Sequence, residues 1–114
     1  MRYRPIRRNS EFGRVYARGK SYVNPALVMY VLKTRGKKTR VGLTATKKIG
    51  HAVQRNRLRR QLREIYRLHE TSFARGYDLV VVARSRAIGA DYAALERAYL
   101  SLAAKLGLLG GQTA

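Results

Sequence analysis

The sequence predicts an α+β fold, a two-layer sandwich in which a four-stranded sheet packs with helices. The 114 residues suit one domain, and a hydrophobic content of 46% indicates a packed core. Short apolar runs typical of strands are mixed with longer segments in which apolar residues recur every three or four positions, typical of helices. The expected order is α-β-β-β-α-β-α. We expect residues 1–114 to form one domain, with a flexible leader at 1–7 and a flexible tail at 107–114.

The first half of the chain contains one predicted helix and three predicted strands. Residues 9–19, "NSEFGRVYARG", indicate a helix that Asn9 or Ser10 can cap. Its residues Phe12, Val15 and Tyr16 share one face. Strands are expected at 20–24, 26–34 and 40–48. The run at 26–34 is apolar on both faces, so both should be covered, whereas the run at 40–48 alternates between a core face and a polar face.

The second half is expected to hold two long helices and one inner strand. The helix at 52–70 has Leu58, Leu62, Ile65 and Tyr66 on its buried side. The run "YDLVVVAR" at 77–84 is apolar enough for an inner position in the sheet. The helix at 87–107 has Asp91 near its start.

The charge of the chain indicates a polyanionic partner. Twenty-five basic residues face six acidic ones, a formal net charge of +19, and eighteen of the basic residues are arginine. A field of this size disfavours the compact state unless a polyanion neutralises it. Arginine binds phosphate with a planar fork of donors and stacks on bases, so nucleic acid is favoured over an anionic membrane surface.

The arginines of the 52–70 helix gather opposite its buried side. Arg59, Arg60, Arg63 and Arg67 form one continuous face, with Glu64 at its edge. Two like-charge pairs at i,i+4 are mildly unfavourable in an isolated helix. A solvated helix face usually mixes charges, so this face is predicted to lie against an anion.

Chemistry carried by the chain itself is not indicated. There is no cysteine, and the six carboxylates form no cluster of the kind that holds metal ions in a nuclease. His69 lies on the apolar side of its helix and is expected to be structural, while His51 suits a phosphate contact. We therefore predict no catalytic residue and no metal ligand. The longest uncharged stretch, 21–32, is too short to span a bilayer and the leader lacks a signal-peptide core, so a cytoplasmic protein is expected.

Residues 41–67, "VGLTATKKIGHAVQRNRLRRQLREIYR", closely resemble the protein subunit of bacterial ribonuclease P. The RNR motif typical of that family is present as Arg55-Asn56-Arg57, preceded by "KKIG" and followed by "LRRQLRE". The segments "NSEFGRVYARG", "ALVMYVL" and "YDLVVVAR" extend the resemblance over most of the chain.

The resemblance implies a four-stranded sheet with a left-handed βαβ crossover that carries the RNR helix, although right-handed crossovers are the general rule. It also implies a subunit of a ribonucleoprotein endonuclease that removes the 5′ leader from precursor tRNA. In that family the catalytic groups and their Mg²⁺ belong to the RNA, and the protein raises substrate affinity and lowers the magnesium requirement. The implied partners are the catalytic RNA and precursor tRNA, with no membrane, no small-molecule substrate and no cofactor bound by this chain alone.

The resemblance assigns residues to two surfaces. The surface for the catalytic RNA comprises Lys48, Arg55, Asn56, Arg57, Arg59, Arg60 and Arg63, to which the helix geometry adds Lys47 and Arg67. The cleft for the single-stranded leader comprises Phe12, Tyr16, Val28, Tyr30 and Thr44. From the sequence alone, aromatic residues at these positions would more often belong to a core. The alternative functions are a ribosomal or ribosome-associated RNA-binding protein and a DNA-compacting protein, neither of which needs a leader cleft.

Overall fold

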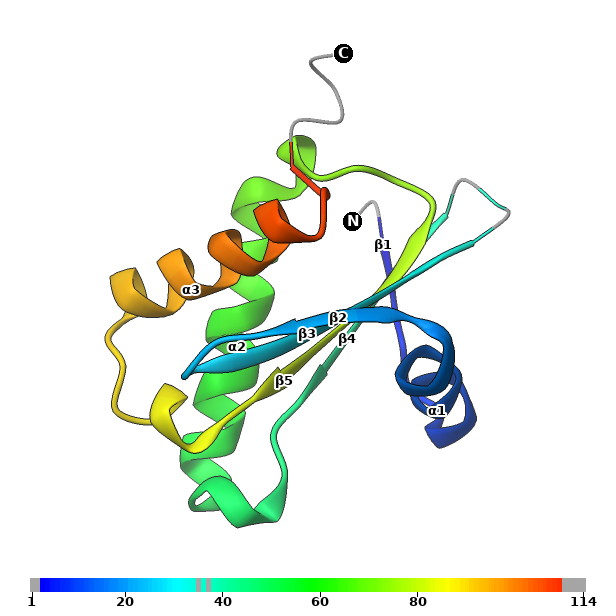
Figure 1. Cartoon of the computed structure of the whole chain (residues 1–114). Coiled ribbons are helices and arrows are strands. Elements are labelled where there is room, and N and C mark those ends of the chain that lie inside the picture. The colour runs from blue at the N-terminus through cyan, green and yellow to red at the C-terminus, as the bar shows by residue number, and fades with distance from the viewer. Residues whose placement is uncertain (1–2, 35, 37, 110–114) are drawn as a thin grey trace.

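The computed structural model describes residues 3–34, 36 and 38–109, without the side chains of Tyr3 and Lys47. Within this part of the chain the fold is a mixed five-stranded sheet with helices on both faces (Figure 1). The elements are β1 (Tyr3–Pro5), α1 (Asn9–Arg18), β2 (Lys20–Val23), β3 (Leu27–Lys33), β4 (Thr39–Thr44), the 3₁₀ turn η1 (Lys47–Ile49), α2 (Ala52–His69), η2 (Glu70–Ser72), β5 (Tyr77–Ala83), η3 (Ser85–Ala87) and α3 (Tyr92–Lys105).

The strands lie in the order β1-β4-β5-β3-β2. β4 is parallel to both β1 and β5, whereas β3 is antiparallel to β5 and β2. β5 lies at the centre and is buried over almost its whole length, which confirms the inner position that its apolar run predicts. The connection from β4 to β5 passes through α2; the left-handed sense implied for this crossover stays a prediction.

The main core lies between the sheet and the pair α2 and α3. Leu58, Leu62, Ile65 and Tyr66 of α2 are all buried there, which confirms the predicted side of that helix. They pack with inner residues of the sheet and with the buried side of α3. His69 lies at the edge of this layer, where its Nε2 is 2.8 Å from Glu96 Oε2 of α3. The pair joins the two helices, as expected for a structural histidine.

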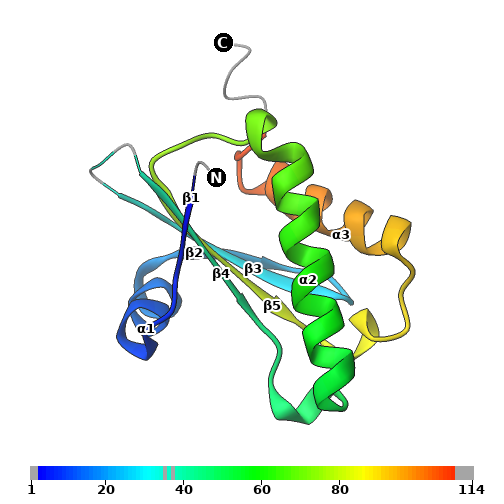
Figure 2. The same cartoon turned by 180° about the vertical axis from the view of Figure 1, so that it is seen from behind.

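The opposite face of the sheet is covered by α1, as both views of the ribbon show (Figures 1 and 2). Val15 of α1 is fully buried against Val80 of β5 and Ile6. The predicted α+β domain, a sheet packed with helices, is therefore confirmed, and α1 forms an additional layer on this second face. The expectation that both faces of the 26–34 strand are covered is confirmed.

The leader forms a fifth strand that the sequence pattern did not predict. Residues 3–5, expected to be flexible, pair with β4 as β1. The backbone N–H of Ile6 continues the pairing by donating to Val41 O at 2.9 Å. Burial of the Ile6 side chain beneath α1 supplies the apolar contact that holds the leader in place.

Several boundaries also differ from those expected. β4 ends at Thr44, and the lysines after it belong to η1. α1 begins after Arg8, so neither Asn9 nor Ser10 is its N-cap. α3 begins after Asp91, whose side chain accepts a hydrogen bond from Ala94 N at 2.8 Å, and not at residue 87.

The tail is ordered further than expected. Leu108 is buried, and Leu109 pairs with Phe73 in an isolated β-bridge. Residues 110–114, the rest of the predicted flexible tail, lie outside the described residues.

One arginine connects three elements on the α1 face. Arg40 of β4 donates from Nε and Nη2 to the two carboxylate oxygens of Asp78 on β5, at 2.9 and 2.6 Å. Its Nη1 donates to Glu11 of α1. The hydrogen bond to Asp78 is the largest cause that raises the pKa of Arg40. Asp78 is only 1% exposed, so this network places a buried carboxylate beside a bidentate partner.

We expect Asp78→Ala to lower the free energy of unfolding by about 2 kcal/mol, because Arg40 would lose its buried partner while staying partly open to water. Urea unfolding followed by circular dichroism measures the change. The matched control is Glu64→Ala, which removes the exposed Glu64–Arg67 ion pair on α2. This control should cost much less, because an ion pair between exposed side chains contributes little to stability. If the two variants lost the same free energy of unfolding, the conclusion that the buried Asp78–Arg40 pair stabilises the fold would be contradicted.

Candidate nucleic-acid interface

Residues on the α1 face of the sheet form three rows that cross the strands. The register places Val28 beside Val82, and Val82 beside Thr44. The next row joins Tyr30, Val80 and Gly42, and the last joins Leu32, Asp78 and Arg40. α1 packs over the middle row, because Val15 is buried on Val80. The other two rows therefore lie along opposite sides of this helix.

The close approach of α1 to the sheet depends on Gly42. A Cβ atom at this position would lie 2.6 Å from Cε1 of the Phe12 ring and 3.1 Å from Ile6 Cβ. Such distances are too short for a side chain to fit without movement. Gly42 thus makes the space in which Phe12 rests on β4.

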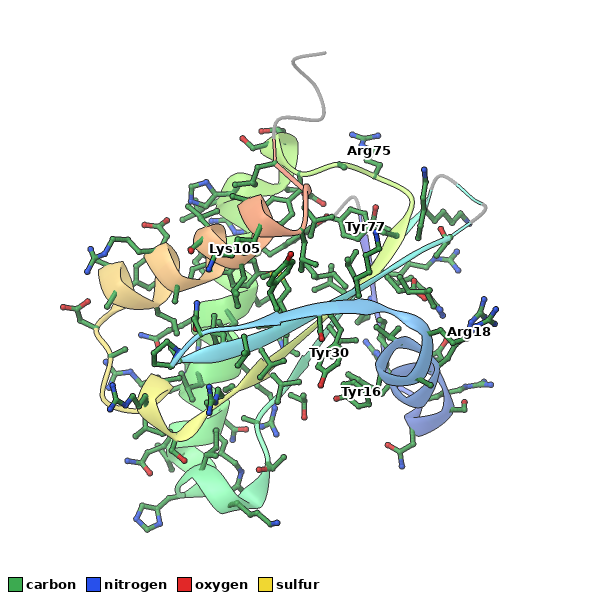
Figure 3. The ribbon with its side chains drawn as sticks, viewed as in Figure 1. Tyr16, Arg18, Tyr30, Arg75, Tyr77 and Lys105 are labelled. Carbon is green, nitrogen blue, oxygen red and sulfur yellow. The ribbon has the colours of Figure 1, made fainter. Side chains whose placement is uncertain are left out.

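Tyr16 and Tyr30 form the aromatic wall and floor beside α1, as the labelled side chains of Figure 3 show. Their rings meet edge to face with centroids 4.9 Å apart, and the Phe12 ring lies 6.3 Å from that of Tyr16. Tyr16 is 41% exposed, so it is a surface residue. Its burial and the neighbouring Tyr30 raise the pKa of the Tyr16 phenol, which stays neutral at pH 7. A neutral aromatic surface next to cations suits single-stranded nucleic acid.

The row of Val28 and Thr44 forms the rest of the cleft floor. Both side chains are half-buried, as is Val82 between them. On β2, Val23 pairs with Val28 and continues the row to the sheet edge, where it is 55% exposed. We use "aromatic cleft" for the part of the surface at which the leader cleft is predicted, formed by Phe12, Tyr16, Val28, Tyr30, Thr44, Val82 and Val23. The last two were missed because only the strand register, which the sequence did not supply, places them beside the predicted five.

The RNR segment follows directly from the end of this floor. Thr44 ends β4, and η1 then leads to Gly50, whose φ of 127° favours glycine. After this turn α2 begins, where Gln54 Oε1 accepts a hydrogen bond from His51 N at 2.8 Å. A few residues of loop therefore separate the aromatic cleft from the basic helix.

Two arginines of the predicted RNA surface brace this loop. Arg55 Nη1 donates to Gly50 O at 2.6 Å. Arg59 is half-buried and donates to Ala45 O at 3.1 Å and to Asn56 Oδ1 at 3.0 Å. These contacts fix the position of the RNR segment relative to β4. Part of the work of these two side chains is therefore structural, which their place in the sequence did not reveal.

The remaining residues of the predicted surface divide into free and paired cations. Lys48, Arg57, Arg60 and Arg63 are exposed, with no hydrogen bond or ion pair to the described part of the protein. Arg67 instead pairs with Glu64, with Nη2 2.5 Å from Oε1, so its charge is already balanced. Lys47 belongs to η1, and its side chain lies outside the described residues.

No metal-binding group occurs in the described part of the chain. Within it, no three histidine, cysteine, aspartate or glutamate side chains gather closely enough to hold an ion. His51 is exposed at the start of α2. No helix among the described residues is both long and apolar enough to cross a bilayer.

A compact α+β fold with a strongly cationic helix and a partly exposed aromatic surface is typical of a small RNA-binding protein. The ribonuclease P family profile matches residues 1–107. The ribonuclease P protein component of Clostridium botulinum is 44% identical over 109 residues, which cover 95% of this chain and 98% of that protein. That of Natranaerobius thermophilus is 40% identical, with 91% and 90% covered.

Solved structures agree with these sequence matches. The ribonuclease P protein of Staphylococcus aureus superposes with a TM-score of 0.86 at 26% identity, over 92% of this chain and 96% of that one. That of Thermotoga maritima gives a TM-score of 0.78 at 28% identity, over 85% and 92%. The chain therefore belongs to the ribonuclease P protein family. It is a subunit of an endoribonuclease that matures the 5′ ends of tRNA. The ribosomal and DNA-compacting alternatives are thereby set aside.

We expect Gly42→Ala to destabilise the fold by about 1–3 kcal/mol, because the new methyl group forces Phe12 away from β4. Thermal unfolding gives the stability, and the summed fluorescence of the eight tyrosines should change if the packing around Tyr16 and Tyr30 changes. Gly13→Ala is the control, since a Cβ atom at Gly13 meets nothing within 4 Å. That change within α1 should stabilise by about 0.5–1 kcal/mol. A stable Gly42→Ala protein with unchanged fluorescence would refute the close-packing argument.

Proposed function

We propose that the aromatic cleft holds the single-stranded 5′ leader of precursor tRNA while the free cations of α2 bind the catalytic RNA. The observation that carries the proposal is the short connection between the two surfaces. β4 supplies the cleft floor at Thr44, and only η1 and one turn separate it from α2. A substrate bound to the catalytic RNA beside α2 would thus have its leader within reach of the cleft.

Each surface suits its ligand for a different physical reason. The cleft offers exposed aromatic rings on an apolar row, which stack with any base and so tolerate many leader sequences. The α2 face offers cations without internal partners, and arginine pairs bidentately with phosphate. These free cations are Arg57, Arg60 and Arg63 of α2, together with Lys48 of the preceding turn η1. The proposed roles of Lys47, Arg55, Asn56 and Arg59 are to shape and extend this face at its loop end.

The chain acts by position and charge in this proposal. Residues of α2 screen the phosphate repulsion between catalytic RNA and substrate, which lowers the need for Mg²⁺. The Mg²⁺ ions and the reacting groups are proposed to belong to the RNA, with no metal or cofactor bound by this chain alone. Cleavage separates the leader from the mature tRNA, so the cleft holds precursor more tightly than product.

We expect Tyr16→Ala to weaken binding of precursor tRNA by about 1–3 kcal/mol in the reconstituted holoenzyme, with little change for mature tRNA. Single-turnover cleavage at limiting magnesium and competition with mature tRNA measure the two affinities. Tyr22→Ala is the control, because Tyr22 is 49% exposed and pairs with Met29, whose side chain lies on the opposite face. Equal losses for precursor and product would exclude a leader contact, and a wild-type protein that does not stimulate cleavage would refute the proposal.

Replacing Arg60 and Arg63 together with alanine should weaken assembly with the catalytic RNA and leave the fold intact, because both side chains are exposed and unpaired. The dependence of the affinity on salt should flatten by about one unit of slope for each phosphate that the variant no longer neutralises. Filter binding over a series of salt concentrations measures both effects. Arg97→Glu on α3 removes the same two units of charge and serves as control. Unchanged assembly in the double variant would contradict the assignment of this face.

A further inference from the structure

A second cationic hollow lies on the other side of α1. Its first part, about 460 Å³, is lined by Arg14, Arg18, Leu32, Lys33 and Thr34. A second part, about 470 Å³, shares Arg18, Leu32 and Lys33 with the first and continues around the sheet edge beside the start of β2. Because the two parts share these three lining residues, we describe them together as the "basic trough". Its cations are Arg14, Arg18, Lys20, Lys33 and Arg75.

The charges of the trough are not neutralised by the protein. Among the described residues that line its two parts there is no carboxylate. Its five cations make no hydrogen bond or ion pair within the described part of the chain. On the α1 face of the sheet, Glu11 and Asp78 are both held by Arg40. Converging cations without counter-charges raise the local concentration of anions.

The lining of the trough distinguishes it from the aromatic cleft. Its floor is aliphatic, formed by Val31, Leu32 and Leu108, and its single aromatic residue, Tyr77, is 3% exposed. Figure 3 shows Tyr16 and Arg18 on different sides of α1. No exposed ring is available among these lining residues for a base to stack on. The trough therefore suits a phosphate backbone and not base recognition.

The position of the trough indicates which RNA it meets. Its α1 part lies on the same face of the sheet as the aromatic cleft, whereas α2 lies on the opposite face. The cleft floor ends at Val23 on the edge strand β2, and Arg18 and Lys20 stand at the corner where α1 passes into that strand. Val23 adjoins Arg84 and Arg86, with which it lines a separate hollow, whereas Lys20 lies at the other end of β2. A strand leaving the cleft at this edge can pass along β2 to Lys20 and Arg18 and then turn into the trough.

We propose that the basic trough binds the backbone of the distal part of the leader, the nucleotides beyond those held in the aromatic cleft. This inference rests on the proposed function of the cleft. Recognition is sequence-independent and electrostatic, since the trough offers charge and an aliphatic floor only. Precursors with long leaders thereby gain affinity that precursors with short leaders do not.

The test uses the reconstituted holoenzyme and two precursor tRNAs, with leaders of about 4 and about 16 nucleotides, the range of single-strand sites on small domains. The variant is Arg18→Ala with Lys33→Ala, two exposed and unpaired side chains. We expect its affinity for the long-leader precursor to fall to that for the short-leader precursor. The salt slope for the long leader should decrease by about 1.4, at about 0.7 for each single-strand phosphate. Binding of the short leader should not change.

Arg97→Glu, which removes the same two units of charge outside the trough, should leave the difference between the leaders intact. Equal affinity losses for both leaders, or no loss for either, would overturn the proposal. Weaker assembly of the trough variant with the catalytic RNA would also overturn the proposal, because the trough would then bind the catalytic RNA and not the leader. A failure of the proposed cleft function can be distinguished from a failure of the trough proposal. Tyr16→Ala should weaken binding of both precursors, whereas the trough variant should weaken binding of the long-leader precursor only.

Discussion

The contact between α1 and the middle row of the sheet determines the form of the whole RNA-binding face. Val15 is buried on Val80, and the missing side chain of Gly42 lets Phe12 rest on β4. Because the helix crosses the strands here, it divides one sheet face into two channels. Aromatic residues of α1 line one channel and arginines of the same helix line the other. A displacement of this single helix would alter both channels at once.

The six carboxylates of the chain explain how a protein with a net charge of +19 keeps its basic surfaces unmixed. Glu11 and Asp78 hold Arg40, and Glu64 holds Arg67. Glu96 joins His69, and Asp91 caps α3. Five of the six acids thus have partners inside the protein. Almost no acidic side chain remains to neutralise the cations that face outward, so those cations depend on RNA for their counter-charges.

The sequence predicted best those parts of the fold in which apolar residues recur at a regular spacing. The buried side of α2 and the central position of β5 follow from apolar spacing, and both are present. β1 could not be predicted, because "YRP" has neither alternation nor length, and its place depends on Ile6 packing beneath a helix distant from β4 in sequence. The resemblance to the family assigned five residues to the proposed cleft, whereas the inclusion of Val82 required the strand register. The bracing role of Arg59 depends on a backbone carbonyl in a loop, which no side-chain pattern encodes.

The two edge strands of the sheet, β1 and β2, limit self-association of the protein in the absence of RNA. β1 has three residues and contains Pro5, which has no N–H to offer a neighbouring strand. β2 has four residues, all exposed, and begins with a lysine. Short edges of this kind are poor templates for pairing with another copy of the chain. Free subunits that await their RNA should therefore resist self-association through their sheets, even with an open apolar row on the face between those edges.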